Sequence, residues 1–119
     1  MNLPVNIHLV VPCYRESGRI GLFLPDLCRE MQALGQVFIE VVEDGSDHEE
    51  AARMRQIVDG LRAQFSCLLP LKELPENLGK GGAVYAGWAG AGQVDWLGFV
   101  DADGSCSPGE VARLVSLLP

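Results

Sequence analysis

The sequence predicts an α/β protein with a mostly parallel sheet and helices on both faces. Short apolar segments rich in β-branched residues alternate with longer segments that repeat apolar side chains at helical spacing. Strands that alternate with helices in this way are typical of a parallel sheet. Hydrophobic residues make up 48% of the 119 residues and charged residues 21%, which is the composition of a globular chain. We therefore expect residues 1–119 to form a single domain.

The first strand and helix are predicted at residues 6–14 and 18–35. Residues 6–14, NIHLVVPCY, form an apolar run that stops near Pro12, as expected for a buried strand. Residues 18–35 place apolar side chains on one helical face, and Gly35 marks the end of the helix. Pro25 predicts a late start or a kink in this helix.

The middle of the chain repeats the same order. Residues 36–46, QVFIEVVEDGS, predict a second strand, and residues 48–65 predict a second helix. Asp47 is a suitable N-cap for that helix, since its side chain can accept a hydrogen bond from the first turn. Residues 67–74, CLLPLKEL, predict a third, shorter strand.

The last third of the chain predicts helix, strand and helix. Residues 80–92 form a helix rich in small side chains, which suits close packing on a sheet. Residues 95–103, DWLGFVDAD, predict the fourth strand. Residues 107–118 predict a final helix with Ser107 as N-cap and Pro108 at the first helical position.

Chemically distinctive residues follow three of these strands. The ends read PCYRE at 12–16, EDGS at 43–46 and DADGS at 101–105. Ligands of parallel α/β sheets bind beyond the carboxyl ends of the strands, so these groups are expected to converge. Asp101 and Asp103 are two residues apart and should share one side of the strand exit. Two adjacent carboxylates repel unless a cation lies between them, and a hard divalent ion meets that need.

Asp and Gly are also common turn residues, so an isolated Asp-x-Asp does not identify a metal site. The order of the motifs along the chain adds the missing specificity. VVPCYRE, VVEDGSD, NLGKGGAVYAGW and FVDADGS occur in that order at suitable spacing. Together they resemble the nucleotide-binding half of a family-2 inverting glycosyltransferase with the Rossmann-like GT-A fold. The similarity is greatest to polyprenyl-phosphate sugar transferases of the dolichyl-phosphate type, and it covers nearly the whole chain.

The resemblance implies nucleoside-binding roles for four residues. Pro12, Tyr14 and Glu16 match the first-strand motif that lines the nucleoside pocket in this family. Asp44 matches the aspartate that contacts the base. The expected ligand is therefore a UDP-sugar or a GDP-sugar.

The resemblance also implies a diphosphate and metal site. Gly79 and Lys80 match the segment beside the base and the diphosphate. Asp101 and Asp103 match the family's DxD motif, which holds Mg²⁺ or Mn²⁺ on the diphosphate, and Asp101 is also expected to reach the ribose. Glu43 stands where the family commonly has aspartate, and Ser105 stands where some relatives have glutamine, so neither receives a role.

The family's acceptor site and general base have no match in this sequence. We expect them to lie outside these 119 residues, in which case the chain alone does not catalyse transfer. The resemblance makes a polyprenyl phosphate the expected acceptor. A sheet edge left without a neighbouring strand favours pairing, so a homodimer is a further expectation.

Charge and cysteine usage limit the partners and the location. The formal net charge is −7 and basic residues are scattered, which argues against nucleic acid as a partner. The four cysteines show no zinc-binding spacing and predict reduced packing residues. No signal peptide or membrane span is evident, so the expected location is cytoplasmic, with contact to a membrane surface left open.

Two alternatives remain from the sequence. The chain could bind a nucleotide-sugar without turnover. FVDADGS also resembles the first motif of haloacid-dehalogenase-type phosphatases, although that motif normally opens its domain and here stands near the end. A nicotinamide-binding domain is disfavoured because the first strand is not followed by GxGxxG.

Overall fold

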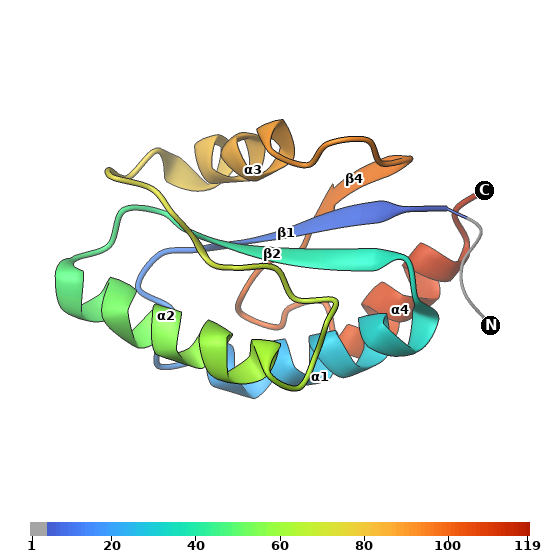
Figure 1. Cartoon of the computed structure of the whole chain (residues 1–119), viewed down its shortest axis with the longest axis horizontal. Coiled ribbons are helices and arrows are strands. Elements are labelled where there is room, and N and C mark those ends of the chain that lie inside the picture. Colours follow the sequence, from blue (N-terminus) through green and yellow to red (C-terminus); the bar gives the residue numbers. More distant parts are fainter. Residues whose placement is uncertain (1–4) are drawn as a thin grey trace.

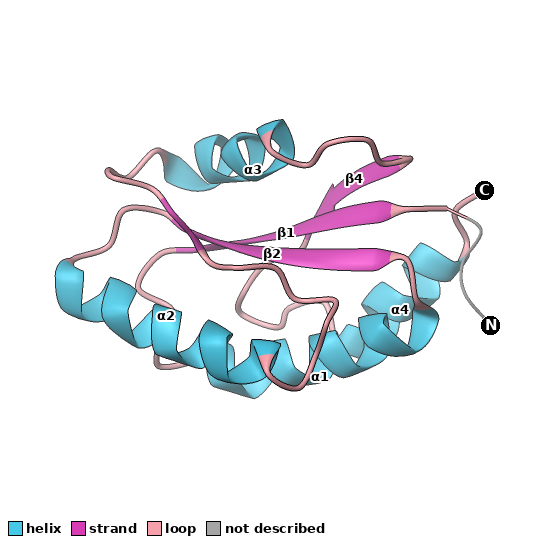
Figure 2. Cartoon of the chain, viewed as in Figure 1, coloured by secondary structure: helices cyan, strands magenta, loops and turns pink. Residues whose placement is uncertain are grey.

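The computed structural model describes residues 5–119 as four strands and four helices in strict alternation (Figures 1 and 2). In chain order the elements are β1 (Ile7–Cys13), α1 (Ile20–Leu34), β2 (Val37–Glu43), α2 (His48–Arg62), β3 (Lys72–Glu73), α3 (Gly79–Ala89), β4 (Trp96–Phe99) and α4 (Pro108–Ser116). The strand order is β3-β2-β1-β4, and every described pair is parallel. The predicted α/β class and parallel sheet are confirmed.

Helices cover both faces of the sheet, as predicted. Figure 1 shows α3 alone on one face, with α1, α2 and α4 on the other. Alternate residues of β1 explain the two cores, because side chains of a strand point to opposite faces in turn. Leu9 and Val11 belong to the larger core under α1, α2 and α4, whereas Val10 packs with Val42 under α3. The three-helix face therefore carries most of the buried apolar surface.

Small residues bring α3 close to the sheet. A side chain added at Gly87 would place its Cβ only 2.6 Å from Val10 Cγ2. That distance is well below ordinary contact, so only glycine fits where the helix crosses β1. The prediction that this small-residue helix packs closely on a sheet is confirmed.

All four strands are shorter than predicted, and β3 and β4 differ the most. β4 ends at Phe99, not at residue 103, because the chain turns where Asp103 Oδ1 accepts a hydrogen bond from Ser105 N at 2.9 Å. Asp101 and Asp103 therefore lie in a turn. The alternation of side chains along a strand does not determine how these two side chains are arranged. β3 has two residues instead of eight, since prolines at 70 and 75 lack the N–H that a sheet ladder needs.

The helix α1 contains Pro25 and still runs without a break from Ile20 to Leu34. A late start is therefore wrong. Proline removes one intrahelical hydrogen bond, and burial of Leu24, Leu27 and other residues on the same helix offsets that loss.

The strand order creates one crevice. The chain moves outward from β1 to β2 and β3, then returns to place β4 on the other side of β1. At such a reversal the loops after neighbouring strands separate and leave room for a ligand. Between residues 5 and 119, none of the helices is long and apolar enough to span a bilayer.

Candidate functional site

A cleft of about 190 Å³ opens at the carboxyl ends of β1, β2 and β4, at the predicted crevice. Its lining residues are Pro12, Cys13, Tyr14, Glu16, Arg19, Asp44, Lys80, Asp101, Ala102 and Asp103. Pockets that enclose a whole small-molecule ligand typically measure roughly 300–1,000 Å³. The cleft is therefore too small to enclose a whole ligand of that kind.

The structure brings together all of the predicted site residues except Gly79. That glycine begins α3 with a φ of 82° and does not line the cleft. Its conformation is one that side-chain-bearing residues adopt at a cost, so it provides the turn that delivers Lys80. Arg19 lines the cleft but was not predicted, although its position three residues after Glu16 is a recognisable ion-pair spacing.

The loop after β1 supplies an aromatic ring and an ion pair. Tyr14 is 41% exposed, and the guanidinium of Arg15 lies 4.9 Å from the centre of its ring. Arg19 donates two hydrogen bonds to Glu16, at 2.7 and 3.0 Å. This contact raises the pKa of Arg19, and it fixes the Glu16 carboxylate toward the cleft.

The end of β2 is locked to the segment before α3. Asp44 is buried, and its two carboxylate oxygens accept hydrogen bonds from Leu78 N at 2.8 Å and Asn77 Nδ2 at 3.1 Å. Gly45 has a φ of 72°, and a Cβ there would lie 2.2 Å from the carbonyl carbon of Glu76. Asp44 therefore fastens the loop that leads into α3, in addition to lining the cleft.

Acidic and basic side chains lie together at the wall of the cleft that is formed by the start of α3 and the turn after β4. Lys80 Nζ lies 2.9 Å from Asp101 Oδ1, and Asp103 accepts the Ser105 N–H. Hydrogen bonds from Ser105 lower the pKa of Asp103, with a smaller contribution from Arg19. Asp103 is thus held as a carboxylate at neutral pH.

The carboxylates fit a hard divalent cation in chemistry, since oxygen ligands are what Mg²⁺ and Mn²⁺ prefer. Within residues 5–119, however, no group of three or more His, Cys, Asp or Glu side chains is arranged to hold a metal ion. Asp101 and Asp103 alone would leave most of the coordination shell open. A cation here needs further oxygen ligands, which a diphosphate can supply.

Cys13 lies in the wall of the cleft but is not suited to nucleophilic or metal chemistry. Burial raises the pKa of its thiol far above the ordinary value, and the carboxylates of Glu16, Glu43 and Glu50 raise it further. The reactive thiolate is therefore not formed at neutral pH. All four cysteines are free, and three of them are buried.

Comparison with known sequences decides the family. A sequence model of "Glycosyl transferase family 2" matches residues 8–118. The chain belongs to glycosyl transferase family 2. The resemblance carried by the four motifs is confirmed, and the match gives no support to the phosphatase alternative. No curated protein sequence gives a significant match to this glycosyltransferase chain.

Solved structures show the same fold. A mannosyltransferase, PcManGT from Pyrobaculum calidifontis, in complex with GDP-Man and Mn²⁺, aligns with a TM-score of 0.74 at 22% identity over 96% of this chain. S. aureus TarS 1–349 aligns with a TM-score of 0.69 at 21% identity over 93% of the chain. The chain covers only 32% and 31% of those two proteins. This similarity confirms the Rossmann-like GT-A fold for this family-2 glycosyltransferase chain, which spans about a third of each neighbour's length.

Proposed function

We propose that this chain binds a nucleotide-diphosphate sugar and serves glycosyl transfer with inversion. One observation carries the proposal. Side chains from four separate segments, after β1, after β2, at the start of α3 and after β4, meet in a single cleft at the point where the strand order reverses. They combine an aromatic ring, carboxylates and a lysine, which together suit a base, a ribose, a cation and a diphosphate.

The structural neighbours support the ligand class. PcManGT was solved with GDP-Man and Mn²⁺, and TarS 1–349 was also solved with UDP-GlcNAc, the latter aligning with a TM-score of 0.56 at 22% identity. Both ligands are nucleotide-diphosphate sugars. We therefore propose a GDP-sugar or a UDP-sugar for this chain.

The nucleoside is proposed to lie against the loop after β1. Pro12 and Tyr14 provide an apolar surface beside the mouth of the cleft, and Glu16 is held by Arg19 as a fixed acceptor for donors on the ligand. Asp44 faces the same cleft, and its carboxylate oxygens have lone pairs beyond those used by the segment before α3. It is the proposed contact to the base.

The diphosphate is proposed to lie between Lys80 and the turn after β4. Asp101 and Asp103 would hold Mg²⁺ or Mn²⁺, and the bound cation would neutralise charge that develops on the departing nucleoside diphosphate. Lys80 Nζ is 2.9 Å from Asp101, so a small movement of its side chain would transfer that ammonium to a phosphate oxygen. Gly79 shapes the turn that presents Lys80.

The rest of the reaction stays a prediction. Direct displacement with inversion by a hydroxyl acceptor needs a general base, whereas an ionised phosphate acceptor is already nucleophilic, and none of the cleft residues is assigned the role of base. A polyprenyl phosphate acceptor, homodimer formation and a cytoplasmic site, at a membrane surface or away from it, likewise remain predictions. Binding of the nucleotide-sugar without turnover by this chain alone is the second candidate, and it is consistent with a chain that spans about a third of each neighbour's length.

Calorimetric titration tests the proposal directly. The 119-residue chain, first shown to be folded by circular dichroism, is titrated with GDP and with UDP, with and without Mn²⁺. We expect binding of one nucleotide that strengthens with Mn²⁺ and is weakened at least about tenfold in Asp103→Ala, since loss of a charged ligand group costs about 1.5–3 kcal/mol.

The matched control is Asp59→Ala, which removes an exposed carboxylate on α2, away from the cleft. Its affinity should equal that of the wild type. Binding that ignores both Mn²⁺ and Asp103→Ala would contradict the metal role. A folded chain that binds neither nucleotide would contradict the proposed ligand.

A further inference from the structure

The loop that carries Tyr14 and Glu16 has no helix or strand of its own between β1 and α1. Its internal bonds are confined to one turn, in which Glu16 O accepts from Arg19 N at 2.9 Å and from Ile20 N at 2.8 Å. Nothing within the loop fixes that turn against the sheet. The contacts that do so come from the segment after β2 and from α2.

Glu50 makes the most direct of these contacts. Its two carboxylate oxygens accept from Ser17 N at 2.7 Å and from Ser17 Oγ at 2.6 Å. Both bonds are short, and together they fix the backbone and the side chain of the residue next to Glu16. Since the two oxygens take two donors of one residue, rotation of the loop about this point would break at least one bond.

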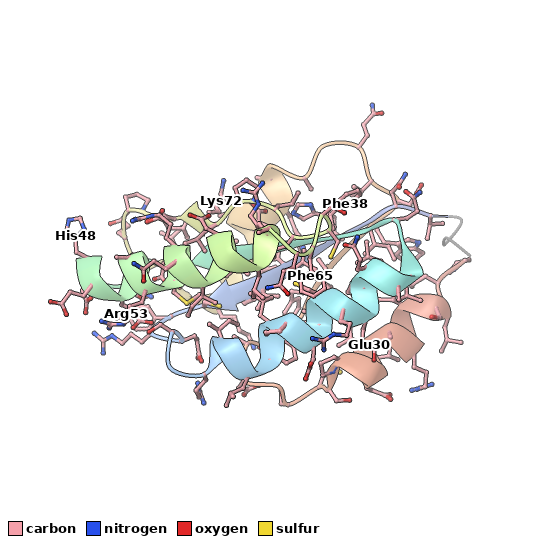
Figure 3. All side chains as sticks on the ribbon, turned by 60° about the horizontal axis from the view of Figure 1, so that its bottom comes forward. Glu30, Phe38, His48, Arg53, Phe65 and Lys72 are labelled. Atoms are coloured by element: carbon pink, nitrogen blue, oxygen red, sulfur yellow. The ribbon has the colours of Figure 1, made fainter. Side chains whose placement is uncertain are left out.

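Glu50 is itself rigidly held. The residue is 7% exposed, lies in the first turn of α2, and its N–H donates to the N-cap Asp47 at 2.9 Å. Arg53 Nη2 lies 3.1 Å from Glu50 Oε1, and Arg53 Nε donates to Ser17 Oγ at 3.2 Å. Figure 3 shows Arg53 on the side of α2 that faces the start of α1. A buried carboxylate with a cation, a helix N-terminus and two neutral donors is a fully partnered anion.

A second buried carboxylate holds the other end of the loop. Glu43 is 1% exposed, and its Oε1 accepts from Ser46 N at 2.8 Å. Ser46 Oγ in turn accepts from Arg15 N at 3.0 Å. Arg15 has a φ of 58°, a left-handed conformation that costs free energy for a residue with a side chain. The contact through Ser46 keeps the backbone beside Tyr14 in that conformation.

We propose that Glu50 is a positioning residue of the nucleotide site, which holds the loop through Ser17 so that Tyr14 and Glu16 face the cleft. This inference rests on the proposed function. Glu50 does not line the cleft and touches no proposed ligand group. Its effect on binding comes entirely from a loop that is ordered before the ligand arrives, which lowers the entropy lost on binding.

The test compares Glu50→Ala and Glu50→Gln with Glu49→Gln in the 119-residue chain. Glu49 is adjacent on α2, its side chain is 87% exposed, and it forms a long ion pair with Arg53 at 3.9 Å. The measurements are the dissociation constant for GDP or UDP with Mn²⁺, and hydrogen exchange of the Ser17 amide by NMR. We expect Glu50→Ala to weaken binding about tenfold or more and to remove protection at Ser17. Glu50→Gln keeps one acceptor and should recover part of the affinity and part of the protection at Ser17. Glu49→Gln should match the wild type in both measurements.

Ser17→Ala gives a second route if Glu50→Ala does not fold. It removes one of the two bonds, and its effect on affinity should be less than additive with that of Glu50→Gln, because both act through one contact. Unchanged affinity in a folded Glu50 variant that has lost Ser17 protection would overturn the inference and leave the proposed function standing. A folded wild type that binds neither nucleotide would overturn the proposed function, and with it the positioning role.

Discussion

At the scale of single residues, two glycines in this chain differ in whether a side chain would fit in their place. Gly45 has a left-handed backbone and lies against the main chain of Glu76, whereas Gly60 lies in α2 with nothing within 4 Å of the position a Cβ would take. The first conformation and contact exclude a side chain. At Gly60 there is room for a side chain, so glycine makes the helix less stable there than alanine would.

Gly45→Ala should destabilise the fold by about 3 kcal/mol or more, because strain and a backbone clash add. Gly60→Ala should instead stabilise it by about 0.5–1 kcal/mol. Thermal and urea unfolding of the two variants measures both changes. Similar stability in the two variants would contradict the packing of Glu76 on Gly45.

Glu50 gives the fold a defined response to acid. Burial by itself would raise the pKa of Glu50, but hydrogen bonds from Ser17 and Arg53 outweigh burial and hold the pKa below its ordinary value of 4.5. A carboxylate with a lowered pKa contributes stability above pH 4.5, and that contribution is lost as the pH falls through the lowered value.

The free energy of unfolding of the wild type should therefore decrease below pH 4.5, and less steeply in Glu50→Gln. Urea titrations at a series of pH values from 7 downward measure this difference. Parallel curves for the two proteins would show that Glu50 has the same pKa folded and unfolded.

At the scale of elements, helix α1 contains a proline whose destabilising effect is offset by the packing around the helix. Pro25 has no N–H to donate inside the helix, yet the apolar face made by Phe23, Leu24 and Leu27 is buried on both sides of it. Tertiary packing of such a face contributes more to helix stability than intrinsic propensity does.

Pro25→Ala should restore the missing hydrogen bond and raise the free energy of unfolding by about 1–3 kcal/mol. The midpoint of thermal unfolding measures the change, with Gly21→Ala on the open side of the same helix as a control for propensity alone. A lower midpoint in Pro25→Ala would mean that the proline ring contributes packing that alanine cannot replace.

Element type was predictable from the sequence, whereas several boundaries were not. The β-branched runs around Val10 and Val41 and the helical spacing of α1 and α2 are strong periodic signals, and these elements are confirmed. The end of β4 was overestimated because apolar periodicity continues to Val100, while the turn at Asp103 depends on a local side-chain bond. The motifs predicted most of the residues that line the cleft but missed Arg19, and they included Gly79, which does not line it. Glu50 was missed as a loop contact because its partner Ser17 is 33 residues away in the sequence. Glu43 was missed because it reaches the loop only through Ser46, which is 31 residues from Arg15.

At the scale of the whole molecule, one edge of the sheet is uncovered in the described chain. β4 is the last strand of the order β3-β2-β1-β4, and its residues Trp96, Leu97 and Phe99 are 39%, 46% and 47% exposed. Strands of a parallel sheet are normally buried on both faces, and a free apolar edge can pair with another strand.

The 119-residue chain should therefore self-associate with increasing concentration, and Leu97→Lys should reduce that association. A charged side chain on the edge opposes strand pairing, as natural sheet edges show. Analytical ultracentrifugation of both proteins over a range of concentrations measures the effect, with Leu22→Lys on the exposed side of α1 as the control for added charge. A monomeric wild type at all concentrations would contradict homodimer formation through this edge.

The ion pair between Lys80 and Asp101 makes the two proposed ligands thermodynamically linked. Without ligands, the ammonium at 2.9 Å occupies one oxygen of a carboxylate that a cation would also use. A metal ion alone must displace Lys80, and a diphosphate alone must approach Asp101 and Asp103 without the metal. If both ligands bound together, Lys80 would pair with the phosphate and the carboxylates would be free to hold the metal, so every charge would keep a partner. Each ligand would then raise the affinity for the other by the same factor, and occupancy of the cleft would rise more steeply with the two ligands together than with either ligand alone.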